Sequence, residues 1–196
     1  MPRPASPPAR RSLPHQVRII GGHWKRTKLE VPDRPGLRPT PDRVRETLFN
    51  WLGQDLAGWR CVDAFAGTGA LGLEAASRGA ADVLLVEADG ALVDALRAVI
   101  KRLDAVHVRV QRGNALTLLA GLPAGATDLV FLDPPFEADL FDKALAATLP
   151  ALAPQGLIYL EAPTPWEGEA LARHGLEVQR HLRAGAVHGH LLRRAA

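Results

Sequence analysis

Short apolar runs alternate with longer amphipathic stretches from residue 60 to the end of the chain. The apolar runs predict strands near residues 60–65, 82–87, 107–111, 127–132 and 156–161. The stretches between them predict helices near residues 70–78, 90–103, 114–120, 138–149 and 165–174. Strands that alternate with helices are typical of a mostly parallel sheet covered on both faces, so the pattern predicts an α/β fold.

Two further strands are expected near the C-terminus, at residues 176–182 and 186–193. No helical stretch separates them, so they are expected to form an antiparallel hairpin rather than a parallel pair. The sequence therefore predicts an α/β domain over residues 59–196 that ends in a C-terminal antiparallel hairpin.

Residues 15–58 show a different pattern, which predicts a small N-terminal extension made of a β-hairpin and a helix. The first part alternates loosely and contains Gly21 and Gly22 at the expected turn. Thr40 suits a helix N-cap and Pro41 the first helical position, so a helix is expected to begin there. The apolar stripe of this helix is formed by Val44, Leu48 and Leu52.

Several classes of protein are disfavoured by composition. Residues 1–14 are rich in Pro, Ala and Arg and contain no acid, so they are expected to be a disordered leader or a tail that contacts RNA. They lack the apolar region of a secretory signal. No apolar run is long enough for a membrane span, so a cytoplasmic protein is expected. Cys61 is the single cysteine, which excludes an internal disulfide, and the histidines lack a metal-ligand spacing, so no metal is expected.

The charge of the chain is distributed unevenly. Residues 1–60 contain twelve Lys and Arg against five Asp and Glu, whereas residues 61–196 contain twelve against sixteen. Positive charge concentrated at one end indicates contact with a polyanion such as RNA. A solvated basic face is the alternative that charge alone leaves open.

A glycine-rich loop follows the first strand of the predicted sheet. Gly67, Gly69 and Gly72 have the G-x-G-x-x-G spacing, and Glu87 ends the next strand twenty positions after Gly67. Glycines let the backbone approach a ligand closely, and an acid at that place can accept hydrogen bonds from both hydroxyls of a ribose. This pattern alone fits NAD(P) as well as S-adenosylmethionine.

Three details favour S-adenosylmethionine. Asp63 precedes Gly67 by four residues, where its carboxylate can face a cationic amine but would repel a pyrophosphate. Asn114 and Ala115 follow the third strand, where they can bond an adenine edge, although Asn114 also suits a helix cap. The fourth strand ends in Asp133 beside the same crevice, which is where ligands of such sheets bind.

The tetrapeptide Asp133-Pro134-Pro135-Phe136 has the composition of a small pocket for a planar amine. The Asp133 carboxylate and the Pro134 carbonyl can both accept hydrogen bonds from an exocyclic amino group, and the prolines bring no competing N–H donors. Phe136 offers a face on which a base can stack. The combination indicates methyl transfer to an amino group of a nucleobase.

Several of these segments together resemble the RsmD family, the bacterial 16S ribosomal RNA (guanine-N2)-methyltransferases. The resemblance rests on the stretch Arg18 to Gly22, the stretch Leu37 to Leu52, the glycine loop and the tetrapeptide that begins with Asp133, and it covers residues 17–193. The glycine loop is shared by many methyltransferases. The N-terminal segments joined to an Asp-Pro-Pro-Phe sequence are far more specific.

This resemblance implies a Rossmann-like class I S-adenosylmethionine-dependent methyltransferase with a seven-stranded sheet. The substrate would be the N2 amine of one guanine in 16S rRNA or the small ribosomal subunit, and the product S-adenosylhomocysteine. Apart from the resemblance, a monomer is expected because the enzyme is small and its substrate is large. The candidate catalytic residues are Asp133, Pro134 and Phe136. The candidate cofactor residues are Asp63, Phe65, Gly67, Gly69, Glu87, Asn114 and Ala115. The candidate RNA-binding residues are Arg18, Trp24, Lys25, Arg26, Lys28, Arg38, Arg43 and Arg45.

Three other functions remain open at this point. Another amino-methyltransferase, acting on adenine N6 or cytosine N4 in DNA or on a protein amide, would use the same pocket, because a pocket of this kind does not fix the substrate. An NAD(P) oxidoreductase would share the glycine loop. A ribosome-assembly factor without catalytic activity would have no need for Asp63 or Asp133.

Overall fold

A seven-stranded sheet forms the centre of the computed structural model, which describes residues 16–32, 34, 37, 39–136 and 140–195. The strand order is β5-β4-β3-β6-β7-β9-β8. The strands are β3 (Arg60–Asp63), β4 (Asp82–Glu87), β5 (Val108–Arg112), β6 (Thr127–Leu132), β7 (Leu152–Ala162), β8 (Leu176–Ala184) and β9 (Val187–Arg194). All seven predicted strands are confirmed, and β7 begins four residues earlier than predicted.

The first five strands in this order run parallel, and β9 runs antiparallel to both of its neighbours, β7 and β8. β3 pairs in parallel with both β4 and β6, so the strand order reverses direction at β3. β9 pairs antiparallel with β7 and with β8, which confirms the predicted C-terminal hairpin. In open sheets of this kind ligands bind at the carboxyl ends of the strands where the order reverses, which here are the ends of β3 and β6.

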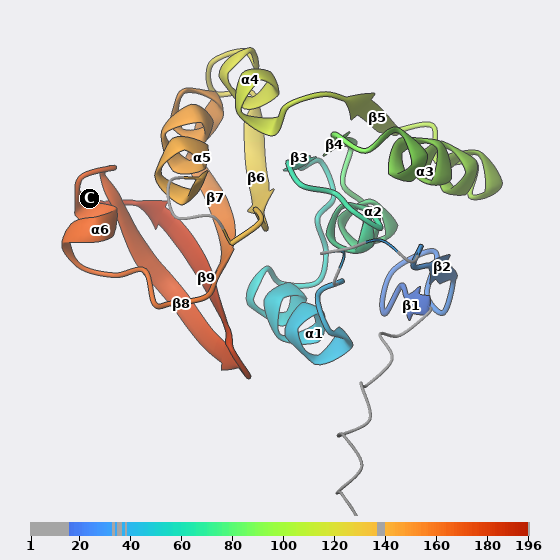
Figure 1. Cartoon of the computed structure of the whole chain (residues 1–196), viewed down its shortest axis with the longest axis horizontal. Helices are drawn as coiled ribbons and strands as arrows, with labels where there is room; N and C mark the ends of the chain where they lie inside the picture. The colour runs from blue at the N-terminus through green and yellow to red at the C-terminus, as the bar shows by residue number, and fades with distance from the viewer. Residues whose placement is uncertain (1–15, 33, 35–36, 38, 137–139, 196) are drawn as a thin grey trace, which may run out of the picture.

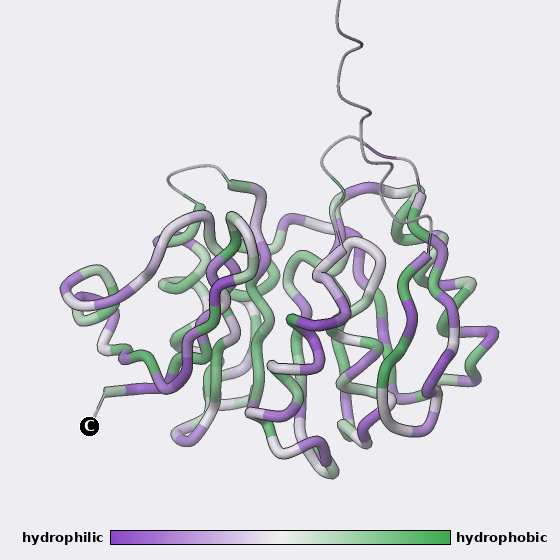
Figure 2. The backbone as a smooth tube through the Cα atoms, turned by 90° about the horizontal axis from the view of Figure 1, so that it is seen from below, coloured by the Kyte–Doolittle hydropathy of each residue, from purple (hydrophilic) through white to green (hydrophobic). Residues whose placement is uncertain are grey.

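Helices cover both faces of the sheet, as Figure 1 shows. One face carries α1 (Asp42–Trp51), α2 (Ala70–Ser77) and α3 (Gly90–Arg102), and the other carries α4 (Ala115–Ala120), α5 (Leu140–Thr148) and α6 (Glu169–Ala172), with a short 3-10 turn η1 (Leu149–Ala151) after α5. Successive residues of a strand point to opposite faces, so Cys61 belongs to the first hydrophobic cluster and Val62 to the second. Figure 2 shows hydrophobic stretches along the interior strands.

Two helix boundaries differ from the prediction. α1 begins at Asp42, because Pro41 has an extended backbone with φ −58° and ψ 148° and so occupies the N-cap position expected for Thr40. α6 spans only Glu169–Ala172 within the predicted 165–174, because its N-cap Gly168 has φ 56° and ψ −131°, outside the helical region. Residues 138 and 139, where the fifth predicted helix begins, and the leader at 1–14 lie outside the described residues.

The N-terminal extension packs into the same core as the sheet. β1 (Gln16–Arg18) and β2 (Lys28–Glu30) pair antiparallel, as the alternation predicts. Ile19 and Leu29 from this hairpin and Leu48 from α1 are buried in one cluster with Phe131 of β6. The predicted stripe of α1 is therefore confirmed as its buried face. Over the described residues, no helix combines the length and apolar character needed to cross a membrane.

Candidate functional site

The glycine loop connects the carboxyl end of β3 to α2 and faces the end of β4. Gly67 and Gly69 adopt φ angles of +53° and +76°, a left-handed region in which a side chain would be strained. The Gly67 N–H donates to Glu87 Oε2 at 2.9 Å, while Glu87 Oε1 accepts from the N–H groups of Ala88 and Asp89. Glu87 is therefore fixed beside the loop, where an acid that binds a ribose is expected.

Asp63 lies beneath the first turn of α2. Its Oδ2 accepts the N–H of Gly72 at 2.9 Å, and a Cβ on Gly72 would collide with Leu85, so only glycine allows this close approach of helix to strand. Asp63 is 2% exposed. Burial raises the pKa of Asp63 to about 7 against the opposing hydrogen bond from Gly72, and the charge of Glu87 adds to the rise.

Two more acids surround the same point. Leu132 pairs with Leu160, so the residues that follow them, Asp133 and Glu161, lie at the ends of adjacent strands. Burial raises the pKa of Asp133 well above its ordinary value, and the charges of Glu161 and Asp63 raise it further, although Asp133 keeps intermediate exposure. Glu161 is buried and accepts the Tyr159 hydroxyl at 2.9 Å.

Glu161 is a site residue that the sequence analysis missed. It stands at the carboxyl end of an apolar strand, as Asp63, Glu87 and Asp133 do, so the same signal could have identified it. The three acids Asp63, Asp133 and Glu161 concentrate negative charge in a poorly solvated crevice. Such an arrangement is stabilised by a bound cation, which suits the ammonium and sulfonium groups of S-adenosylmethionine better than a pyrophosphate.

The tetrapeptide leaves the carboxyl end of β6 at this crevice. Pro134 is buried, whereas Phe136 is 53% exposed, an unusual value for a large apolar side chain. The ring centroid of Phe136 lies 6.4 Å from that of Phe141, and the centroid of Phe141 lies 5.7 Å from that of Trp166. An exposed aromatic ring held by others behind it can serve as a stacking surface for a base.

The other candidate cofactor residues lie at the edge of the same crevice. Asn114 is the N-cap of α4, because its side chain accepts the Thr117 N–H at 3.1 Å. This capping role leaves its amide nitrogen available. Ala115 is buried in the first turn of α4, and Phe65 packs against the cluster below the loop with part of its ring exposed.

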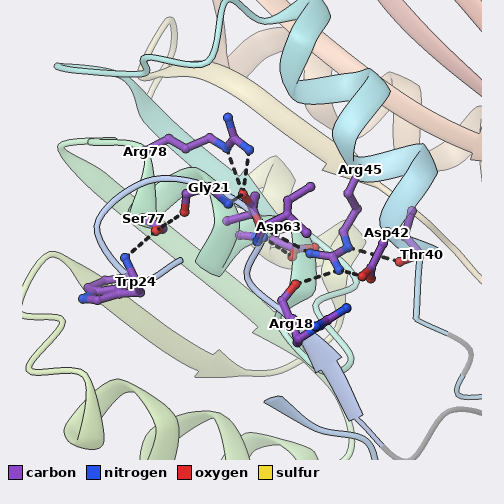
Figure 3. A network of polar contacts seen from close by, with 12 residues as sticks. Arg18, Gly21, Trp24, Thr40, Asp42, Arg45, Asp63, Ser77 and Arg78 are labelled. Atoms are coloured by element: carbon purple, nitrogen blue, oxygen red, sulfur yellow. Dashed lines mark hydrogen bonds and ion pairs between the residues drawn. The ribbon is translucent and has the colours of Figure 1, made fainter. Parts of the chain in front are cut away.

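Arg45 is not available to RNA, which contradicts its prediction as a phosphate contact. Its side chain is fully buried, and Nη1 lies 3.3 Å from Glu74 Oε2 while Nη2 donates to the carbonyl of Arg18 at 2.8 Å (Figure 3). The reason is Glu74, a buried acid on α2 that binds Arg45 and Arg78 and accepts the backbone N–H groups of Ile20 and Gly21 at 2.8 Å each. An acid within the apolar sequence of α2 was the available signal.

The remaining basic candidates lie in two different places. Trp24, Lys25 and Arg26 occupy the turn of the N-terminal hairpin, which is fixed to the carboxyl end of α2 by the Trp24 N–H donating to Ser77 Oγ at 2.8 Å. The Trp24 ring also stacks on His107, which precedes β5, at 5.7 Å between centroids. This turn therefore lies at the amino ends of the strands, opposite the carboxyl ends where the crevice lies.

Arg43 lies nearer the crevice. Leu37, which precedes α1, contacts the glycine loop, since a Cβ on Gly67 would lie 3.1 Å from Leu37 Cδ1. The segment after α1 reaches the far end of α2, where the Leu56 N–H donates to the Arg78 carbonyl at 2.9 Å. α1 thus begins at the crevice edge, and Arg43 is exposed in its first turn. Arg18 and Lys28 are exposed on the hairpin strands, and Arg38 lies outside the described residues.

Cys61 lies outside this site. Cys61 is buried, and burial raises the pKa of its thiol to about 12, so it is a packing residue. Among the described side chains, no group of three or more His, Cys, Asp or Glu residues could hold a metal ion.

The chain is similar to known proteins over most of its length. The family model described as "Conserved hypothetical protein 95" matches residues 17–193. A protein of Escherichia coli K12 named "Ribosomal RNA small subunit methyltransferase D" is 49% identical over 151 residues, which are 75% of each chain. Its counterpart of that name in Haemophilus influenzae is 40% identical over 151 residues, or 74% of this chain and 78% of the relative.

A solved structure gives the same result for the fold. An Escherichia coli protein, provisionally described as the methyltransferase yhhF, superposes with a TM-score of 0.79 at 39% identity, over 92% of this chain and 99% of the other. The Rossmann-like methyltransferase fold, with its seven strands and C-terminal antiparallel hairpin, is thereby confirmed.

Proposed function

The chain belongs to the RsmD family, whose sequence model carries the description Conserved hypothetical protein 95, and from this premise we propose that it methylates small-subunit ribosomal RNA. The acceptor that we propose is the exocyclic N2 amine of one guanine in 16S rRNA, and the donor is S-adenosylmethionine. The observation that carries the proposal is the tetrapeptide beginning at Asp133, placed at the end of β6 beside the glycine loop. A single copy of the chain in the cytoplasm would act on the rRNA or the small subunit.

The residues around the glycine loop fit this donor. Glu87 would accept the ribose hydroxyls, and Asn114 would bond the adenine edge. Asp63 and its acidic neighbours would hold the positively charged end, because a cation offsets the unfavourable burial of three carboxyl groups. When bound, S-adenosylmethionine supplies an electrophilic methyl group on a positively charged sulfur.

Asp133 and Pro134 would position the acceptor amine. The lone pair of a guanine amine is delocalised into the ring, so the amine is a weak nucleophile. Hydrogen bonds from the amine to the Asp133 carboxylate and the Pro134 carbonyl would draw the nitrogen toward a pyramidal geometry and free the lone pair. Phe136 would stack on the base and fix its plane.

Positioning is the main catalytic contribution in this proposal. Well-oriented reactants can lower a barrier by roughly 7–11 kcal/mol without any acid or base. The target guanine must be unpaired and unstacked to reach the crevice, so the substrate is a loop nucleotide or a nucleotide flipped out of a helix. The proton lost by the amine would pass to Asp133 or to water.

The direct test is a methylation assay. The purified chain is incubated with labelled S-adenosylmethionine and either naked 16S rRNA or small subunits that lack the modification, and the RNA is then digested to nucleosides. We expect label in N2-methylguanosine. Label in N6-methyladenosine, or label only in DNA or protein when these are offered instead, would show that the proposed acceptor is wrong.

A further inference from the structure

The turn of the β8–β9 hairpin lies at the same edge of the sheet as the crevice. His188, just after this turn, pairs with Ala162, the last residue of β7. Because β7 runs parallel to β6, its carboxyl end lies at the edge where Asp133 follows β6. Three strand spacings of about 4.8 Å separate β6 from β8, which is a distance of roughly 14 Å.

This hairpin carries positive charge that has no acidic neighbour along the chain. No Asp or Glu occurs between Val178 and Leu192. Arg183 is exposed, and its Nε donates to the carbonyl of Gly185 at 3.2 Å. Within the described part of the chain no carboxylate forms an ion pair with Arg183, so its charge is available to an anionic partner.

Three histidine rings stack beside Arg183 on the same face of the hairpin. His181 is exposed, and its ring lies 4.8 Å from that of His190 and 5.2 Å from that of His188, with interplanar angles of 22° and 7°. His190 is fixed from both sides, because its Nε2 accepts the Trp166 N–H at 3.0 Å and its Nδ1 lies 3.3 Å from the Leu160 carbonyl. The stack is therefore rigid, with His181 as its outer member.

A cavity lies between this stack, α6 and Trp166. Its volume is about 500 Å³, and its lining includes Trp166, His181 and His190. Trp166 contacts Phe141, which in turn contacts Phe136 at the crevice. Sites for small ligands have volumes of about 300–1,000 Å³, so the cavity has room for a nucleobase.

We propose that this cavity is a second RNA subsite, which holds a nucleotide a few positions from the methylated one. The base would lie between Trp166 and His181, and its phosphate would contact Arg183. At 3.4 Å for each stacked nucleotide, the roughly 14 Å to β6 corresponds to about four nucleotides. Two acids line the cavity, Glu167 and Glu177, and Glu177 is paired with Arg193 at 2.7 Å. Their carboxylates repel phosphate, which directs the backbone of the RNA to the Arg183 side. The inference rests on the proposed function, since it extends the same RNA along the protein.

The test uses the full chain with two exposed residues replaced, His181→Ala together with Arg183→Ala. We expect the KM for unmodified 16S rRNA to rise about tenfold or more, because one stacked base and one phosphate contact are lost. The slope of log affinity for the RNA against log salt should fall by about 0.7–0.9. The kcat at saturating RNA and the affinity for S-adenosylmethionine should not change.

Two further variants separate stacking and local charge from general effects. His181→Phe keeps a stacking ring, so it should retain most of the RNA affinity that His181→Ala loses. Arg109→Ala removes an equal charge at the far edge of the sheet, where Arg109 binds Asp82 at 2.7 Å, and should leave the KM and the slope unchanged.

The outcomes distinguish the two proposals. An active wild-type enzyme whose double variant keeps the wild-type KM and salt slope would overturn the subsite. Equal losses in the double variant and in Arg109→Ala would also overturn it, since they would reflect net charge alone. A wild-type chain that binds S-adenosylmethionine but methylates no rRNA would instead overturn the proposed function.

Discussion

Asp133 and Asp63 both lie in a poorly solvated crevice, where the ionised form of each carboxyl group is unfavourable. Burial is the first cause of the raised pKa of each carboxyl group, and neighbouring acids are the second for Asp133. A protonated carboxyl group carries an O–H donor and is a weaker hydrogen-bond acceptor than a carboxylate. A bound cation lowers these pKa values, so the methyl donor would itself prepare Asp133 to accept the amine.

Asp133→Ala should lower kcat on rRNA by at least roughly a hundredfold while leaving the affinity for S-adenosylmethionine nearly unchanged, because a positioned group of this kind contributes about 10²–10⁴ in rate. Single-turnover kinetics and calorimetry measure the two quantities. Asp94→Ala, which removes an exposed acid on α3, is the matched control and should keep full activity. Equal turnover in the Asp133 variant would exclude this residue from the reaction.

Asp63→Asn should make the ligand-free protein more stable at pH 8. The pKa of Asp63 is about 7 in the folded chain and 3.8 in its ordinary state, so folding favours the protonated form and stability falls as pH rises from about 4 to about 7. The neutral amide removes that loss, which is on the order of a few kcal/mol. Urea denaturation at pH 4 and pH 8 checks this, and a wild-type stability that rises over the same interval would contradict it.

The same Asp63 variant should bind S-adenosylmethionine more weakly, by about 1.5–3 kcal/mol for the lost charged hydrogen bond. For the wild type, affinity should increase as pH rises through 7, because the cation binds the ionised carboxylate. Calorimetry in buffers of different ionisation enthalpy would detect the released proton. An affinity that is independent of pH in both proteins would exclude contact between Asp63 and the positive end of the donor.

The sequence identified the residues at the ends of β3, β4 and β6, because an acid after an apolar strand is a local pattern. Its one indication that Arg45 is buried is indirect: the acid Glu74 within the apolar sequence of α2, which pairs with Arg45 from 29 residues away in the chain. An arginine in an amphipathic helix looks exposed until its partner is known. Contacts between distant segments decide such positions, and no local pattern contains them.

Helix α2 contacts both the glycine loop region and the N-terminal hairpin. Its first turn supplies the Gly72 N–H to Asp63, and its later turns supply Glu74 and Ser77, which bind the backbone of the N-terminal hairpin. Glu74 is fully buried and bridges Arg45 of α1 and Arg78 at the end of α2. Removing one partner of a buried ion pair leaves the other charge without compensation.

Glu74→Gln should therefore destabilise the protein by about 3–5 kcal/mol in urea denaturation. The control is Arg97→Ala, which breaks an ion pair with Asp94 whose side chains are 60% and 75% exposed, and which should change the free energy of unfolding little. Equal effects of the two substitutions would mean that the buried network contributes no more than a surface pair. A soluble fragment of normal stability that lacks residues 16–58 would contradict the network's role as well.

Strand positions were well predicted because the central strands β3, β4 and β6 are short apolar runs, whereas β5 and β8 alternate apolar and polar residues. Helix ends were less well predicted, because they depend on single backbone angles, as the extended Pro41 shows for α1. The length of β7 was underestimated, because its first residues, Leu152 to Gln155, contain a proline that argues against a strand interior. Pairing with β6 there begins with a register shift that accommodates the proline.

Across the whole molecule, the basic residues form a set that extends beyond the crevice. Arg43 lies near the crevice edge, whereas Lys25 and Arg26 lie beyond the far end of α2. This helix has eight residues, which is about 12 Å at 1.5 Å per residue. A short RNA that fills the crevice can contact Arg43 without reaching the hairpin turn.

Arg43→Glu should consequently weaken binding of a short 16S rRNA fragment and flatten its salt dependence by about one contact. Lys25→Glu combined with Arg26→Glu should have little effect on the fragment but should weaken binding to the whole small subunit, which is large enough to contact both edges. Filter binding at several salt concentrations measures both. If the double variant also lost affinity for the short fragment, the placement of the hairpin turn away from the bound RNA would be wrong.

The shared helix also has a thermodynamic consequence. RNA bound to the N-terminal hairpin would stabilise the carboxyl end of α2. S-adenosylmethionine bound at the glycine loop would stabilise the amino end of the same helix. The ligand that binds first orders α2, so the second ligand loses less conformational entropy when it binds. rRNA and S-adenosylmethionine should therefore raise one another's affinity by the same factor, as linkage between equilibria requires. Ser77→Ala, which removes the hydroxyl that accepts the Trp24 N–H, should reduce that factor equally for both ligands.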